Sequence, residues 1–120
     1  MKTKQIQLMK NLFSKVDVFV TPTTGLPPPE ITLDMLKYGS SDLTTSGAVM
    51  RFITLANFTG VPAISCPVGY TAEKGLPIGI QFTGKWWSEA LLLKIAHASE
   101  LLFTSRKQPQ IHFDLLESSK

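Results

Sequence analysis

Residues 57–81 read NFTGVPAISCPVGYTAEKGLPIGIQ, and glycines and prolines divide this stretch into two short apolar runs. The runs at residues 61–69 and 76–83 have strand-like composition, and the polar residues 70–75 between them are few enough for a hairpin connection. Neither run alternates cleanly between apolar and polar residues, so we expect strands that are buried on both faces. The sequence therefore predicts a β-hairpin at the centre of the fold.

Residues 44–57, before the hairpin, carry apolar side chains at helical spacing. The residues of this stripe are Ala48, Val49, Phe52, Ile53 and Ala56. Thr44, Thr45 or Ser46 is available as the N-cap, and Gly60 follows the last turn. We therefore expect a single buried helix over residues 44–57.

Three further elements surround this centre. Residues 3–13 have helical spacing and precede a β-branched run at residues 16–20, which predicts a helix followed by a short buried strand. Residues 31–38 predict two helical turns closed by Gly39. After the hairpin, Ser88 is expected to cap a helix. Its stripe consists of Leu92, Ile95, Ala96, Ser99 and Leu102.

Composition limits the domain count and the classes of function. The 120 residues allow one domain, which we place at residues 1–103, followed by a polar tail at residues 104–120. The net charge of +3 arises from scattered residues without a basic block, so no nucleic-acid partner is predicted. The lone Cys66 rules out an internal disulfide and favours a reducing, cytoplasmic location. No run approaches the ~18 apolar residues of a membrane span.

Ser65 and Cys66 are the candidate nucleophiles, and His97 and His112 are the candidate bases. Nucleophilic catalysis requires a hydroxyl or thiol beside a base and oxyanion donors. The sequence around Ser65 lacks the Gly-x-Ser-x-Gly elbow, and nothing in the sequence places either histidine beside it. A small buried core side chain is the better interpretation of Cys66, and no zinc-ligand spacing occurs. We therefore predict no catalytic residue, no metal and no cofactor in this chain.

The glycines and prolines of residues 57–81 resemble the C-terminal signature of the amidase-signature hydrolases. Residues 17–23, DVFVTPT, resemble the family's strand that ends in a threonine-proline-threonine loop. Residues 84–92, GKWWSEALL, extend the match, with Trp86 where relatives commonly carry proline. The MRF sequence that begins at Met50 is most like the plant fatty acid amide hydrolase branch. The resemblance implies an α/β class chain, the C-terminal part of an α/β/α fold with a mixed sheet.

The resemblance also implies an enzyme that hydrolyses carbon–nitrogen bonds in amides, including fatty acid amides, with a serine–cis-serine–lysine triad. The glycine- and serine-rich segment that carries this triad does not occur in the sequence. The chain is therefore expected to be inactive alone and to need the N-terminal part of the fold, or another chain, as its partner. For a lipid amidase, association with a membrane is compatible with a cytoplasmic location.

In the fatty acid amide hydrolases, the positions that match Ser46, Val49 and Ile53 line the channel for the acyl chain of the small-molecule substrate. These residues lie at i, i+3 and i+7 of the expected helix, and ordinary core contacts explain that spacing equally well. Two alternatives for the whole chain stay open. One is a non-catalytic α/β binding or structural module, and the other is an α/β domain whose resemblance is limited to packing.

Overall fold

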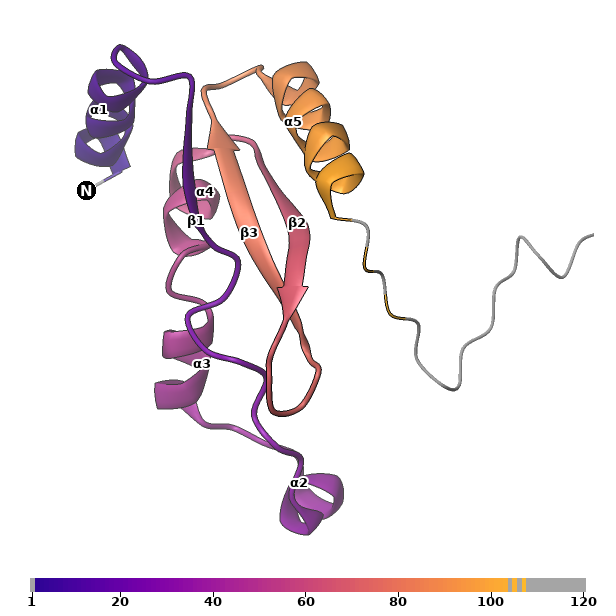
Figure 1. The fold of residues 1–120 in the computed structure, drawn as a ribbon. Coiled ribbons are helices and arrows are strands. Elements are labelled where there is room, and N and C mark those ends of the chain that lie inside the picture. The colour runs from indigo at the N-terminus through magenta and orange to yellow at the C-terminus, as the bar shows by residue number, and fades with distance from the viewer. Residues whose placement is uncertain (1, 104, 106, 108–120) are drawn as a thin grey trace, which may run out of the picture.

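The computed structural model describes residues 2–103, 105 and 107. Its elements are α1 (Lys2–Phe13), β1 (Val18–Pro22), α2 (Leu33–Tyr38), α3 (Leu43–Val49), α4 (Thr54–Thr59), β2 (Ala63–Tyr70), β3 (Pro77–Gly84) and α5 (Glu89–Leu102) (Figure 1). Most of the expected polar tail at residues 104–120, including His112, lies outside the described residues.

The predicted hairpin is confirmed, because β2 and β3 are neighbouring antiparallel strands. Their register runs from Ala63 opposite Thr83 to Tyr70 opposite Pro77, with an irregularity between Pro67 and Gly69. β1 pairs with the other edge of β3, also antiparallel, and gives the strand order β1-β3-β2. Within the described residues the sheet is thus purely antiparallel, whereas the family resemblance implied a mixed sheet.

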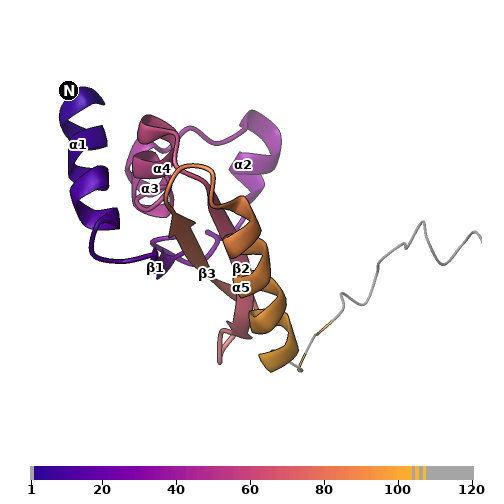
Figure 2. The same cartoon turned by 90° about the horizontal axis from the view of Figure 1, so that it is seen from above.

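Helices lie on both faces of this sheet. α5 packs against β2 and β3 on one face, and α3 and α4 lie on the other (Figure 2). This cover is incomplete, since Val20, Val68 and Ile78 expose 53%, 39% and 45% of their surface. The expectation of strands buried on both faces is therefore wrong for these strands, because so few elements cover so small a sheet.

The apolar core lies where α1 meets α4. Met9, Phe13 and Val61 are buried there. The partly buried side chains packed around them are Leu12, Phe19, Leu55, Ala56 and Trp86. The ring of Phe13 lies 5.9 Å from that of Phe19 and 6.3 Å from that of Trp86, measured between centroids. These contacts are of the size and geometry that stabilise aromatic clusters, so they hold α1 on the rest of the chain.

The helix expected over residues 44–57 is interrupted, so that prediction is wrong. α3 ends at Val49, α4 starts at Thr54, and α3 contains no buried residue. The Val49 carbonyl accepts the Gly25 N–H at 3.1 Å, and the Ile53 N–H donates to the Met50 carbonyl at 3.2 Å. Apolar spacing did not reveal the interruption, because Gly25, which donates its N–H to the Val49 carbonyl, is distant in sequence. Gly60 follows the last turn of α4, as expected, and adopts the left-handed conformation.

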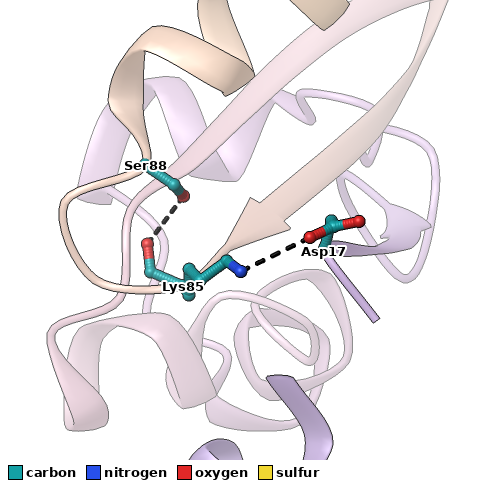
Figure 3. Close-up of polar contacts among 3 residues, drawn as sticks. All are labelled: Asp17, Lys85 and Ser88. Carbon is teal, nitrogen blue, oxygen red and sulfur yellow. Dashed lines mark hydrogen bonds and ion pairs between the residues drawn. The ribbon is translucent and has the colours of Figure 1, made fainter. Parts of the chain in front are cut away.

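The turn from β3 into α5 is held by side chains of Asp17, Lys85 and Ser88 (Figure 3). Lys85 Nζ lies 3.4 Å from Asp17 Oδ1, next to the start of β1. Ser88 occupies the N-cap position, but its hydroxyl donates to the Lys85 carbonyl at 2.6 Å and does not cap the helix. The prediction that Ser88 is the N-cap residue is therefore confirmed for its position, whereas its side chain forms no capping hydrogen bond. In α5 itself, Leu92 is buried as expected, whereas Leu102 is 86% exposed.

Candidate functional site

A groove of about 300 Å³ lies beside α2 and α3. Its lining residues are Pro29, Met35, Ser40, Asp42, Thr45, Ser46, Val49 and Met50. Pro29 belongs to a three-proline segment, in which fixed φ angles hold the chain extended. The groove is thus formed by two short helices and a stiff loop.

Local capping interactions set the positions of both helices. Thr32 caps α2, since its side chain accepts the Met35 N–H at 3.3 Å, and Gly39 ends this helix with a φ of 78°. Asp42 caps α3, since its Oδ1 accepts the N–H groups of Thr44 and Thr45 at 2.9 and 3.1 Å. The expectation that residue 44, 45 or 46 is the N-cap is therefore wrong. Aspartate is among the best N-caps, so the sequence contained the correct signal one residue before the helix.

Asp42 is held in its charged form by the start of α3. The Thr45 hydroxyl donates to Asp42 Oδ2 at 2.5 Å, and this bond is the main reason why the pKa of Asp42 lies below its ordinary value of 3.8. The N–H groups of Thr45 and Thr44 act in the same direction, while desolvation opposes them. One side of the groove therefore carries a negative charge at neutral pH.

Two of the three predicted substrate residues lie in this groove. Ser46 and Val49 line it, whereas Ile53 does not appear among its lining residues. Ile53 lies in the turn after α3, at the N-cap position of α4. The i, i+7 relation predicted for it required a continuous helix, which the structure does not have. The role of these residues in substrate binding stays a prediction.

Sequence reasoning missed Met35 and Met50, which also line the groove. Met35 comes from α2, and Met50 is the C-cap residue that directly follows α3. Methionine is flexible and apolar, so it adapts to irregular apolar ligands. No periodicity links α2 to α3, and the sequence therefore offered no signal that their side chains share a groove. Together with Val49, the two methionines give this groove an apolar wall suited to an alkyl chain.

A second hollow, of about 320 Å³, lies between β2 and α5. It brings together the candidate nucleophiles Ser65 and Cys66 with the candidate base His97. Their chemistry is unfavourable, however. The Ser65 hydroxyl is hydrogen-bonded with Thr23 at 2.5 Å, and His97 Nδ1 lies 3.9 Å from a carboxylate oxygen of Glu100. His97 is thus next to an acid, and the described residues show no hydrogen bond from it to either nucleophile.

Cys66 is buried, as expected of a small core side chain. Desolvation raises the pKa of its thiol, and the negative charge of Glu100 raises it further. A thiol with a raised pKa is protonated at neutral pH, and the protonated form is a poor nucleophile. The geometry of this hollow therefore does not favour nucleophilic catalysis.

Among residues 2–103, 105 and 107, no group of three or more potential ligand side chains is arranged to hold a metal ion. In the same part of the chain, none of the helices combines the length and the apolar character needed to cross a membrane.

Comparison with known proteins places this fold. The sequence model of the family described as Amidase matches residues 1–93. The chain is 50% identical over 106 residues to a fatty acid amide hydrolase of Medicago truncatula, covering 88% of this chain and 17% of that protein. The resemblance to the plant fatty acid amide hydrolase branch is thus confirmed.

Solved structures agree with this assignment. The structure of 6-aminohexanoate cyclic dimer hydrolase superposes with a TM-score of 0.74 at 28% identity, over 91% of this chain and 24% of that chain. The peptide amidase of Stenotrophomonas maltophilia gives a TM-score of 0.58 at 27% identity, over 94% and 21%. The helices and strands described above therefore match part of the fold of larger enzymes. The Amidase sequence model matches residues 1–93, and half of the aligned residues are identical in the plant relative. This chain therefore belongs to the Amidase family.

Proposed function

We propose that this chain forms the C-terminal part of an enzyme that hydrolyses the amide bond of fatty acyl amides. In this proposal, the groove beside α2 and α3 receives part of the acyl chain. The nucleophile, the bridging serine and the lysine come from polypeptide that is not part of this sequence, so the chain alone is inactive.

The observation that carries the proposal is the convergence of Ser46, Val49, Met35 and Met50 on one groove. An acyl chain needs an apolar wall, because each buried methylene group contributes about 0.8 kcal/mol to transfer from water. The 50% identity to a protein described as a fatty acid amide hydrolase supports the same class of substrate. The second hollow supports no rival chemistry, since the pKa of the Cys66 thiol is raised and the Ser65 hydroxyl is hydrogen-bonded with Thr23.

A hybrid enzyme tests the proposal. Residues 1–103 of this chain replace the matching segment of the Medicago truncatula enzyme, and hydrolysis of long-chain and short-chain acyl amides is measured. We expect the hybrid to be active. Val49→Trp should then reduce kcat/KM for the long-chain substrate much more than for the short-chain substrate, because an indole blocks only the distal part of the groove.

Thr44→Trp is the matched control, because Thr44 lies exposed on the same helix and does not line the groove. It should leave the ratio of the two substrates unchanged. Equal losses on both substrates in Val49→Trp, together with a lower melting temperature, would identify Val49 as an ordinary core residue and contradict the proposal. A folded but inactive hybrid would favour a non-catalytic module.

A further inference from the structure

Gly79 and Gln81 belong to the glycine- and proline-rich stretch quoted above, and neither lines the groove. Gln81 is nevertheless buried in the middle of β3. Its side chain is only 7% exposed. In the strand register, Gln81 lies opposite Thr21 of β1 and Ser65 of β2, so these three side chains share one face of the sheet. A buried amide needs hydrogen-bond partners, since an unsatisfied one is costly. The partner of Gln81 therefore indicates what this residue does.

Gln81 reaches from the sheet to the turn that ends the groove's wall. Its Nε2 donates to the Phe52 carbonyl at 3.4 Å, a long hydrogen bond. Phe52 lies in the turn between α3 and α4. This turn directly follows Val49 and Met50, which line the groove. The Gln81 amide thus links the centre of the sheet to the interruption between the two helices.

Gly79 shapes the same face of the sheet. The hydroxyls of Thr23 and Ser65 meet there at 2.5 Å. A Cβ on residue 79 would lie 2.6 Å from Thr23 Oγ1 and 3.2 Å from Ser65 Oγ, so glycine provides the space for their contact. We call Thr23, Ser65, Gly79 and Gln81 the polar seam. The seam runs from Ser65 of β2 across β3 to Thr23, which directly follows β1.

A second link holds the end of α3 from the opposite direction. The Gly25 N–H donates to the Val49 carbonyl at 3.1 Å. A Cβ on Gly25 would lie 2.1 Å from the Ala48 carbonyl oxygen, so the backbones approach as closely as glycine allows. The loop after β1 therefore holds the end of α3, and the side chain of Gln81 holds the turn that follows it.

We infer that Gln81 is a positioning residue for the substrate groove. It sets the position of Val49 and Met50 relative to the sheet through the Phe52 carbonyl, and so sets the depth available to an acyl chain. That Gln81 positions Val49 and Met50 is inferred from the contacts alone. That this position affects the choice of substrate rests on the proposed function.

Hydrogen exchange in the full 120-residue chain tests the structural part. Gln81→Met keeps the size of the side chain and removes the donor. We expect the Gly25 amide and the amides of residues 50–53 to exchange about five times faster, which corresponds to the loss of one hydrogen bond of ordinary strength. Gln7→Met is the control, because Gln7 is another glutamine, exposed on α1, and should change none of these rates.

Gln81→Glu provides a test by rescue. Its carboxylate cannot donate to the Phe52 carbonyl, whereas its protonated form can. Relative to the unsubstituted chain at each pH, exchange at Gly25 should be fast at neutral pH and return toward normal in acid. Unchanged exchange in Gln81→Met, or an equal increase across α1 and the whole sheet, would overturn the inference, since Gln81 would then be irrelevant or a general core residue.

The hybrid enzyme tests the effect on substrate choice. Gln81→Met should raise KM for the long-chain amide about fivefold, leave KM for the short-chain amide unchanged, and leave kcat unchanged. Equal changes for both substrates would contradict the positioning role. Failure of the proposed function would be distinguishable, because Val49→Trp would then show no chain-length dependence while Gln81→Met would still alter exchange at Gly25.

Discussion

Different interactions stabilise the two ends of this molecule. At the end where α1 meets α4, Met9, Phe13 and Val61 form a buried apolar cluster. At the end formed by α2 and α3, neither helix contains a buried residue, and Leu33 and Leu36 are 83% and 73% exposed. Figure 1 shows α2 standing away from the sheet at this end. Here caps and backbone contacts, instead of apolar burial, define the geometry.

This difference matters because the candidate groove lies at the weakly packed end. Its walls depend on the caps at Thr32 and Asp42 and on the contact between Gly25 and Val49. Regions with few buried contacts open at low free energy cost. The apolar side chains left exposed on α2 are the kind of surface that normally contacts another part of a protein. The groove is thus expected to reach its full rigidity only within the complete enzyme.

The largest effect is expected from a truncation in the apolar cluster. Phe13→Ala removes a ring that packs between Phe19 and Trp86, and should lower the free energy of unfolding by about 3–5 kcal/mol. Leu36→Ala, at the other end, should change it little, because this side chain is 73% exposed. Denaturant titration of each variant measures both values. Equal losses would mean that the two ends do not differ in packing.

An intermediate effect is expected at the backbone contact that holds α3. Gly25→Ala places a Cβ 2.1 Å from the Ala48 carbonyl oxygen, so the end of α3 must move. We expect a loss of about 1–3 kcal/mol of stability, as in other overpacked sites. Gly47→Ala is the matched control, because a Cβ there meets nothing within 4 Å and alanine favours the helix. An equally large loss of stability in Gly47→Ala would show that the substitutions act on the helix itself and not on the contact between Gly25 and Ala48.

A smaller effect is expected from pH at the Asp42 cap. Its pKa is lowered in the folded chain, so its contribution to stability is complete above the ordinary value of 3.8 and is lost as pH falls through the folded-state pKa. The amide signals of Thr44 and Thr45 should shift in that range in NMR spectra. Asp42→Asn retains a good N-cap without a titrating group, and its spectra should stay constant there. Identical titrations in both proteins would exclude Asp42 as the cause.

The smallest effect concerns the sheet between the two ends. The raised pKa of the buried Cys66 thiol predicts slow alkylation by iodoacetamide at pH 8 in the folded chain, and fast alkylation in denaturant. Mass spectrometry follows the added group over time. Fast alkylation of the folded chain would show an accessible thiolate and would make the hollow between β2 and α5 a candidate reactive site again.

The hairpin was predictable from sequence because its signals are local. Glycines and prolines bound both strands, and the turn between them is polar. The helix prediction over residues 44–57 was wrong because apolar spacing continues through the turn, while the contacts that interrupt the helix come from Gly25 and Gln81. Such contacts between distant segments leave no periodic pattern. Of the candidate groove, the sequence and the family resemblance together indicated Ser46 and Val49, whereas Met35 could be assigned only once the positions of α2 and α3 in space were known.

Photolabelling tests the central claim most directly. A long-chain acyl amide that carries a diazirine near the end of its alkyl chain is bound to the hybrid enzyme, irradiated and mapped by mass spectrometry. If the groove beside α2 and α3 receives the acyl chain, the label should be found on Met35, Val49 or Met50, and an excess of unlabelled amide should prevent it. Label confined to residues outside this groove would contradict the account.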